Sequence, residues 1–214
     1  MSREEVLRRV RAALERGGRA DVDVPRDYLD SHGMDENPVE LLARHLADYR
    51  ARVHRAGDEA ELAALIGRLL AERGARRVVV PEGLPPRWLA GAPGVARVPD
   101  AAGASPPELD AVDSVVTGCA LAIAETGTLV LDGGPAQGRR RITLVPDHHV
   151  CVVRVPEQVV ESLPQALPRL DPRRPLTWIS GPSATSDIEL SRVEGVHGPR
   201  ALDVVLLGPG PQGA

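Results

Sequence analysis

The most informative absence in this sequence is lysine, because all 26 basic residues are arginines. Without a lysine the chain cannot form a Schiff base, anchor pyridoxal phosphate or supply the lysine of a phosphate-binding P-loop. Any anion that binds here must therefore be held by arginine side chains, by backbone N–H groups or by hydroxyl groups.

Aromatic residues are also scarce: phenylalanine is absent, and the chain has two tryptophans and two tyrosines. The hydrophobic core must therefore be built from valine, leucine, isoleucine and alanine. Few rings are available to stack on the bases of single-stranded nucleic acid, and the net charge of -4 lacks the basic surface that such a partner needs. We expect no nucleic-acid partner.

Cysteine occurs only as Cys119 and Cys151, which form no C-x-x-C pair. Two thiolates cannot hold an iron–sulfur cluster or a four-cysteine zinc ion. Both cysteines lie in apolar, strand-like runs, so we expect buried, reduced thiols. His148 and His149 are adjacent in such a run, so their side chains should point to opposite faces and cannot easily share a metal. We therefore expect no metal and no cofactor in this chain.

No apolar run approaches the ~20 residues that a membrane-spanning helix needs. The N-terminal residues 1–16 are charged throughout and lack the apolar centre of a signal peptide. These absences predict a cytoplasmic protein without a membrane span.

Hydrophobic periodicity predicts three helices in the first third of the chain. They cover residues 2–16, residues 38–55 and a segment that begins after Asp58, whose carboxylate is placed to cap it. The stretch between the first two helices is rich in aspartate, glycine and proline and is typical of a connector. We therefore expect a helical N-terminal extension over residues 1–56 and an α/β domain over residues 57–214.

Short apolar runs separated by glycine and proline turns dominate the rest of the chain. We expect strands at residues 77–80, 95–98, 112–116, 121–124, 129–131, 142–145, 150–155, 176–179 and 202–207, and a helix at residues 156–167. Strands that are apolar throughout are typical of a sheet covered on both faces. The runs between residues 112 and 155 follow one another too closely for parallel crossovers, so some must form hairpins. These patterns predict an α/β fold: a three-layer αβα sandwich with a mixed, mainly parallel sheet.

The segment 124–131 places a carboxylate, Glu125, at a turn between two apolar strands. Gly127 permits a positive φ or a close backbone approach in this turn, and Thr126 and Thr128 add hydroxyl groups. Glu125 could act as a base, as a covalent nucleophile or as a gate that repels anions. The alternative is an ordinary hairpin turn whose glutamate points into water.

The segment 180–189 is rich in hydroxyl groups and directly follows a predicted strand. Its candidate binding residues are Ser183, Thr185, Ser186, Asp187 and Glu189. In open α/β sheets, ligands bind beyond the carboxyl ends of the strands. A glycine turn that leads into a helix would also present free N–H groups to a carboxylate or phosphate. Alternatively, a serine or threonine here only caps that helix.

A third candidate segment, 194–200, contains His197 with glycines close on both sides, followed by Arg200. An imidazole can titrate near neutral pH, and an arginine can hold a carboxylate in a fork, although a loop histidine is more often solvated. Arg140 and Arg141 belong to a run of arginines. Such a run is usually a solvated surface, but one member could turn inward toward an anion.

Taken in order, these segments resemble the lactate utilization (LUD) domain, and specifically its protein C subfamily. The residues that carry the resemblance are Ala124-Glu125-Thr126-Gly127-Thr128, Pro146 and His149 within Val145-Pro146-Asp147-His148-His149-Val150, Ser180-Gly181-Pro182-Ser183-Ala184-Thr185-Ser186-Asp187-Ile188-Glu189, and Gly195-Val196-His197-Gly198-Pro199. The resemblance covers roughly residues 112–207, whereas the N-terminal helical part matches only in general layout.

The resemblance implies a fold like that of glucosamine-6-phosphate deaminase, ribose-5-phosphate isomerase and the CoA transferases, which agrees with the predicted mixed sheet. It also implies a role in a system that oxidises L-lactate to pyruvate with two partner proteins, at least one of which carries iron–sulfur clusters. With two cysteines, this chain would not be the electron-carrying subunit.

Three functions remain open from the sequence. In the first, the chain binds a small carboxylate such as lactate through Arg140 or Arg141 and through N–H groups near residues 183–186, and His197 takes the hydroxyl proton. In the second, Glu125 is the nucleophile of an acyl or CoA transferase, a function suggested by the fold alone. In the third, the chain is a non-catalytic assembly subunit whose N-terminal helix docks on the iron–sulfur partners.

Overall fold

The structure is a computed structural model and describes residues 2–17, 23–27, 29–31, 33, 36–101, 103–185, 193–194 and 198–209. The helices are α1 (Arg3–Arg16), α2 (Pro38–Asp48), α3 (Glu59–Glu72), α4 (Pro106–Asp110) and α5 (Leu163–Ala166), with 3-10 helices η1 (Pro86–Leu89), η2 (Arg140–Thr143) and η3 (Leu167–Arg169). The strands are β1 (Arg52–Ala56), β2 (Arg77–Val80), β3 (Ala96–Pro99), β4 (Ser114–Gly118), β5 (Leu121–Ile123), β6 (Thr128–Leu131), β7 (His148–Arg154), β8 (Val159–Val160), β9 (Thr177–Ile179), β10 (Ala184–Thr185), β11 (Val193–Glu194) and β12 (Ala201–Leu207).

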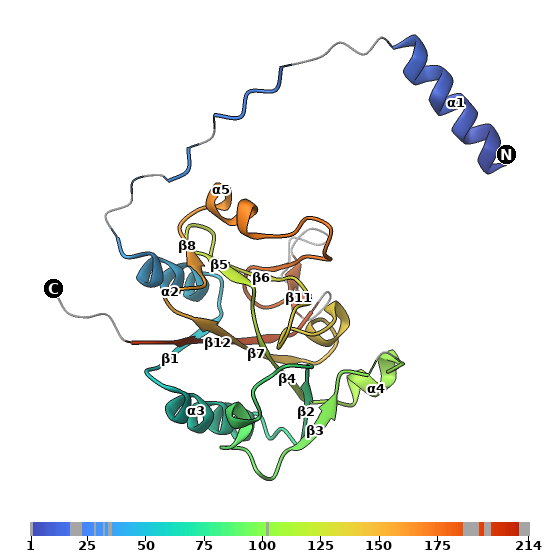
Figure 1. Ribbon diagram of the computed structural model, residues 1–214. Helices are drawn as coiled ribbons and strands as arrows, with labels where there is room; N and C mark the ends of the chain where they lie inside the picture. Colours follow the sequence, from blue (N-terminus) through green and yellow to red (C-terminus); the bar gives the residue numbers. More distant parts are fainter. Residues whose placement is uncertain are drawn as a thin grey trace.

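Within the described residues, the strands form two main sheets and one short pair (Figure 1). The larger sheet has six strands in the order β1-β12-β7-β4-β2-β3, and each neighbouring pair is parallel. The smaller sheet has the order β8-β5-β6-β9 and contains the antiparallel pairs β5–β6 and β6–β9. The predicted α/β class is confirmed, and the expected hairpin is β5–β6. Parallel and antiparallel pairing thus lie largely in separate sheets.

Helix α3 covers one face of the larger sheet. The Asp58 carboxylate accepts hydrogen bonds from Ala60 N and Glu61 N, so it caps the helix as its position in the sequence predicts. The apolar stripe of α3 packs against strand residues such as Val150 and Val205. Each leucine that is fully buried in this layer contributes about 1.5–3 kcal/mol to stability.

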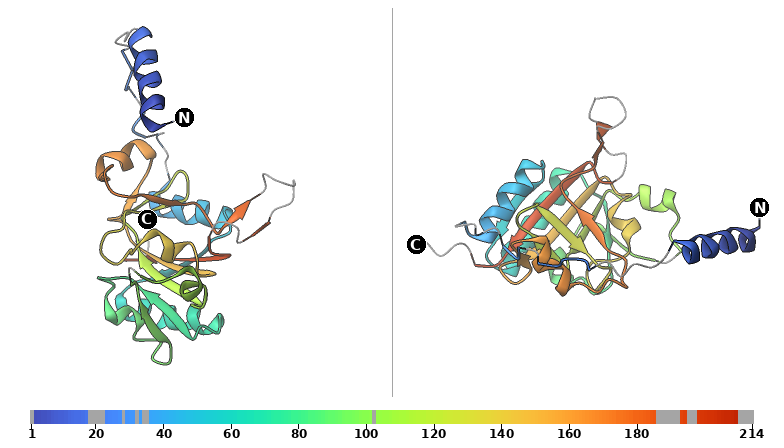
Figure 2. Two further views of the ribbon diagram at one scale, coloured as in Figure 1. Left: turned by 90° about the vertical axis from the view of Figure 1, so that its right-hand side faces the viewer. Right: turned by 90° about the horizontal axis from the view of Figure 1, so that it is seen from above.

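The other face of the larger sheet is covered by α2 and by the smaller sheet. Leu41, Leu42 and Leu46 of α2 lie in one buried cluster with Cys151 of β7 and with apolar residues of β5 and β6. Helix α5 packs on the outer face of the smaller sheet, so the layers run from α3 through both sheets to α5 (Figures 1 and 2). Cys119 and Cys151 are both free and buried, as predicted.

The N-terminal part of the body differs from the prediction. The helix expected at residues 38–55 ends at Asp48, and residues 52–56 form the edge strand β1, which pairs with β12. Pairing with a seven-residue buried strand decides the conformation of this segment, because local helix propensity is a weak preference that tertiary contacts override. Residues 38–56, which we expected in the N-terminal extension, therefore pack with the α/β body.

Two further segments correct the secondary structure predicted from apolar runs. Residues 142–145 begin in the 3-10 helix η2, where a strand was expected. Residues 156–167 contain β8 and the short helix α5, where one helix was expected. Strand β8 pairs with β5, and Pro164 is compatible only with the first turn of the helix that follows.

Helix α1 differs from α2 and α3 because none of its residues is buried. Ser2 caps it by accepting a hydrogen bond from Glu5 N. Its apolar stripe, which includes Val6, Val10 and Leu14, is exposed, and the helix stands apart from the body in Figure 1. Among the described residues, no helix has the length and apolar character that crossing a membrane requires.

Candidate functional site

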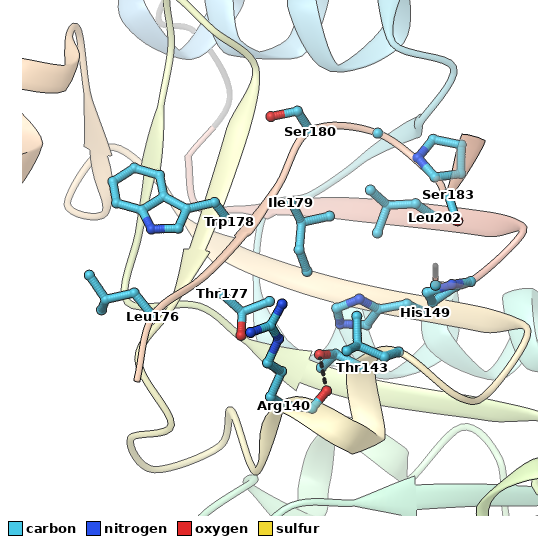
Figure 3. Close-up of a pocket in the computed structure, with 15 residues that line it drawn as sticks. Arg140, Thr143, His149, Leu176, Thr177, Trp178, Ile179, Ser180, Ser183 and Leu202 are labelled. Carbon is cyan, nitrogen blue, oxygen red and sulfur yellow. Dashed lines mark hydrogen bonds between the residues drawn. The ribbon is translucent and has the colours of Figure 1, made fainter. Parts of the chain in front are cut away.

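A cavity of about 470 Å³ opens between the larger sheet and the edge strand β9 of the smaller sheet (Figure 3). It is lined by Arg140, Thr143, Leu144, His149, Leu176, Thr177, Trp178, Ile179, Ser180, Gly181, Pro182, Ser183, Gly198, Pro199 and Leu202. The residues come from η2, β7, β9 and β12, from the loop that follows β9, and from residues directly beside η2, β9 and β12. This volume lies within the range of about 300–1,000 Å³ that is typical of small-molecule sites.

Two glycines hold the loops around this cavity against the end of α2. Gly181 has φ +80°, and a Cβ atom there would lie 2.4 Å from the carbonyl oxygen of Tyr49. Gly127 has φ +57°, and a Cβ atom there would lie 2.8 Å from the carbonyl carbon of His45. A side chain would be strained at either position, so the predicted role of Gly127 in a close backbone approach is confirmed.

The turn around Gly127 is joined to the cavity wall by hydroxyl groups. Thr128 Oγ1 lies 2.8 Å from Thr126 Oγ1 and 2.8 Å from Ser180 Oγ. Ser180 lines the cavity, whereas the three residues of the Thr-Gly-Thr turn do not. Thr126, Gly127 and Thr128 therefore support the wall behind the site.

His149 is the most deeply buried polar residue in the wall, with 1% of its surface exposed. Its Nε2 atom lies 2.7 Å from the hydroxyl oxygen of Thr117 on the adjacent strand β4. Its Nδ1 atom has no hydrogen-bond partner among the described residues. Burial, and to a smaller extent the neighbouring His148, lower the pKa of His149 to about 3. The imidazole is therefore neutral at physiological pH, and one of its nitrogens has no partner among the described residues.

Arg140 is the member of the arginine run that lines the cavity. Its guanidinium makes no ion pair or hydrogen bond with any described residue, and Figure 3 shows it beside Thr177 on the same side of β9 as His149. Arg139 instead pairs with Asp100, and Arg141 donates to the carbonyl oxygen of Ala104 at 2.7 Å. The expectation that one arginine turns toward an anion site therefore fits Arg140 and does not fit Arg141.

A second hollow of about 300 Å³ adjoins the first and shares Arg140, Thr143 and Thr177 with it. Arg174 lies in its wall and donates to Asp132 at 2.6 Å. The cavity thus continues past Arg140 into a hollow whose wall contains the ion pair of Arg174 and Asp132.

Glu125 lies away from this cavity. Its Oε1 accepts a hydrogen bond from Leu163 N at 2.9 Å, at the start of α5, and it lines a small separate hollow with Ser31 and Ser162. The structure therefore does not bring Glu125 together with Ser183. The carboxylate binds the backbone at the start of a helix, which neither the nucleophile nor the solvated-turn interpretation anticipated.

The hydroxyl-rich segment lines the cavity only in its first half. Ser183 lies in the wall, and its N–H donates to the carbonyl oxygen of Pro199 at 2.8 Å. Residues 184–185 form strand β10, paired with β11, so the described residues do not begin the helix that we expected there. The side chain of Thr185 and the whole of Ser186, Asp187, Glu189 and His197 lie outside the described residues.

Sequence reasoning missed the pairing of His149 with Thr117. The available signal was a polar side chain inside each of two otherwise apolar strands, because buried polar groups nearly always have partners. The two residues are 32 positions apart, so no local motif joins them. Only the register of β4 against β7 does so.

His148 points to the opposite face of the larger sheet, as predicted from the alternation along a strand. Its Nδ1 lies 2.9 Å from Ser114 Oγ, and its Nε2 donates to Asp203 at 2.8 Å. Asp203 also accepts hydrogen bonds from His54 and from Arg52, both at 2.6 Å. Burial alone would raise the pKa of Asp203, but these hydrogen bonds outweigh it and hold the pKa well below its usual range.

This second group forms a Ser–His–Asp chain, yet its geometry indicates a structural role. Ser114 and Asp203 are fully buried, so neither the serine hydroxyl nor the carboxylate can contact a substrate. Among the described residues, no three His, Cys, Asp or Glu side chains are placed to hold a metal ion.

Comparison with known proteins finds a matching family model and relatives that are named lactate utilization proteins. The family model of the LUD domain matches residues 39–207. "Lactate utilization protein C" of Deinococcus radiodurans is 50% identical over 153 residues, which cover 70% of this chain and 70% of that protein. "Lactate utilization protein C" of Halalkalibacterium halodurans is 36% identical over 93 residues, 39% of this chain and 40% of that protein.

A solved structure shares the fold. The crystal structure of a DUF162 family protein from Deinococcus radiodurans superposes with a TM-score of 0.68 and 39% sequence identity. The match covers 80% of this chain and 96% of that chain.

Proposed function

This chain belongs to the LUD domain family, and we propose that it serves lactate utilization by binding a small 2-hydroxy or 2-oxo carboxylate in the cavity between β7 and β9. The names of its relatives point to lactate as the substrate of the system. Oxidation of L-lactate gives pyruvate, and both molecules carry a carboxylate next to a carbon that bears one oxygen. The cavity should therefore offer a cation and a second polar group.

The observation that carries this proposal is that one wall contains both a guanidinium and a buried imidazole nitrogen that have no hydrogen-bond partner among the described residues. Arg140 offers a planar fork of donors that matches a carboxylate. His149 Nδ1, in the same wall, is the group that we assign to the oxygen on the neighbouring carbon. An unsatisfied buried polar atom costs about 1–3 kcal/mol, and a ligand oxygen at Nδ1 would remove that cost.

Isothermal titration of the purified chain with pyruvate and with L-lactate tests the proposal. We expect saturable binding in the millimolar range or tighter. Arg140→Ala should weaken it by about tenfold to a hundredfold, because a charge-assisted hydrogen bond is lost. Arg141→Ala, from the same arginine run but outside the cavity, is the matched control and should bind as the parent does. Absence of binding, or equal binding by both variants, overturns the proposal.

We also propose that the electrons leave through iron–sulfur partner proteins. Oxidation of lactate releases two electrons and two protons, and two buried cysteines cannot ligate a cluster. Co-expression with the iron–sulfur proteins should therefore give lactate-dependent dye reduction that falls when this chain is left out. Unchanged dye reduction without this chain contradicts its place in the system.

The exposed stripe of α1 favours a second role, docking on those partners. Val6, Val10 and Leu14 form an apolar face with no cover among the described residues. Deletion of residues 1–37 leaves the whole α/β body and should abolish co-purification with the partners. If the shortened chain assembles as well as the full chain, α1 is not the docking element.

A further inference from the structure

The hydrogen bond between Thr117 and His149 decides which imidazole nitrogen carries the proton. Thr117 is fully buried, and among the described residues its hydroxyl has one partner, His149 Nε2 at 2.7 Å. A buried hydroxyl that leaves its O–H undonated loses a hydrogen bond at a large cost. The hydroxyl therefore donates to Nε2, and Nε2 must be unprotonated to accept.

The neutral imidazole has a single proton, so this assignment places it on Nδ1. Nδ1 has no partner among the residues that the structure describes, and it belongs to a side chain that lines the cavity. The cavity wall thus contains, besides the guanidinium of Arg140, a buried N–H donor on His149 whose position is fixed by the tautomer. Among the described wall residues, the Arg140 guanidinium and the Nδ1–H of His149 are both hydrogen-bond donors, and the accepting nitrogen of His149 is already bound to Thr117.

We infer that the cavity selects a 2-oxo acid over its 2-hydroxy counterpart, with His149 Nδ1–H donating to the keto oxygen, and that Thr117 is the positioning residue that fixes this tautomer. The inference deepens the proposed function and rests on it. A keto oxygen and a carboxylate only accept hydrogen bonds, which matches two donors. A 2-hydroxy acid adds an O–H that needs an acceptor. The imidazole offers none, because its accepting nitrogen is occupied by Thr117, so this O–H must turn away from His149 toward a wall hydroxyl such as Thr177 or Ser180.

The same assignment limits the chemistry of this site. His149 cannot take the hydroxyl proton of lactate, because its accepting nitrogen is occupied by the hydrogen bond from Thr117. The site is therefore built to hold the 2-oxo acid, which is the product in the direction of lactate oxidation.

The tautomer is tested without any ligand by ¹⁵N NMR of the imidazole rings in the full chain. His149→Gln identifies the His149 signals by their loss. We expect Nδ1 to resonate as the protonated nitrogen and Nε2 as the unprotonated one. Thr117→Ser keeps the hydroxyl and should preserve this pattern, whereas Thr117→Val, of nearly equal size, should mix the two tautomers. A protonated Nε2 in the parent chain overturns the inference.

Selectivity is tested by titrating pyruvate and L-lactate into the same variants. We expect pyruvate to bind about tenfold more tightly than L-lactate, a difference equivalent to one hydrogen bond. Thr117→Val should remove most of that preference, and Thr117→Ser should restore it. Equal or tighter binding of L-lactate overturns the selectivity while the proposed function stands. Failure of both acids to bind overturns the proposed function, and the NMR spectrum then still decides the role of Thr117.

Discussion

Strand β7 carries two neighbouring histidines that differ in how many of their ring nitrogens have a hydrogen-bond partner. This difference indicates a structural role for one histidine and a binding role for the other. His148 has partners on both nitrogens, Ser114 and Asp203, beneath α3. His149 has Thr117 on one nitrogen and nothing described on the other, beside a cavity. A fully satisfied buried histidine stabilises the sheet. A half-satisfied one in a cavity wall costs stability unless a ligand completes it.

The largest effect should come from breaking the network beneath α3. Asp203→Ala leaves His148, His54 and Arg52 without their shared carboxylate in a buried site, so the free energy of unfolding should fall by about 3–5 kcal/mol. Urea unfolding at neutral pH measures this. The exposed pair Arg200–Asp147 supplies the control, and Asp147→Ala should change stability by less than about 1 kcal/mol. Equal effects would remove the distinction between the two kinds of ion pair.

Replacing each of the two histidines by glutamine, in separate variants, distinguishes their roles. His148→Gln should lower the free energy of unfolding by about 2–3 kcal/mol, because a buried hydrogen bond to a carboxylate is lost, and should leave pyruvate binding unchanged. His149→Gln should weaken pyruvate binding about tenfold and reduce stability less. Urea unfolding and titration calorimetry on both variants give the comparison. Weaker binding in His148→Gln with normal binding in His149→Gln would reverse the assignment of the two faces.

Titration of His149 should make the free energy of unfolding depend on pH, with a smaller effect than the substitutions above. Its pKa is about 3 in the folded chain and about 6.5 when unfolded, so between these values only the unfolded state binds the proton. The free energy of unfolding should therefore fall as the pH drops below about 6.5, by up to about 1.4 kcal/mol per pH unit. Stability present above pH 6.5 is lost on acidification, and His149→Gln should remove this slope.

Asp203 affects stability in a lower pH range than His149 does. Its folded pKa lies below the ordinary value, so its contribution is present above about pH 4 and is lost as the pH falls further. Urea midpoints measured at several pH values in the parent chain and in His149→Gln distinguish the two groups. An unchanged slope between pH 6.5 and 4 in His149→Gln would show that another group titrates there.

Much of the fold was predictable because its signals are local. The cap at Asp58, the apolar runs of β2 and β12 and the close spacing that requires a hairpin each depend on a few neighbouring residues. The predicted secondary structure was wrong where a strand that is distant in the sequence decides the local conformation. Residues 52–56 become a strand because β12 lies beside them, and residues 159–160 become one because β5 does.

The site was predictable only in outline. The loop at Ser180 and Ser183 lies in the cavity wall, as its position after a strand indicated. Glu125 was singled out as a chemical group, but its carboxylate accepts a hydrogen bond from a backbone N–H 38 positions away, which no pattern in the turn reveals. His149 became informative only through the unpartnered state of one nitrogen, a property of the folded chain.

The most direct test follows the imidazole nitrogens of both histidines by ¹⁵N NMR while pyruvate is added to the full chain. The account predicts a saturable shift of His149 Nδ1 and no change in His148, because one ring faces the cavity and the other is enclosed beneath α3. A spectrum in which pyruvate leaves His149 unaffected, or moves His148 instead, would contradict it.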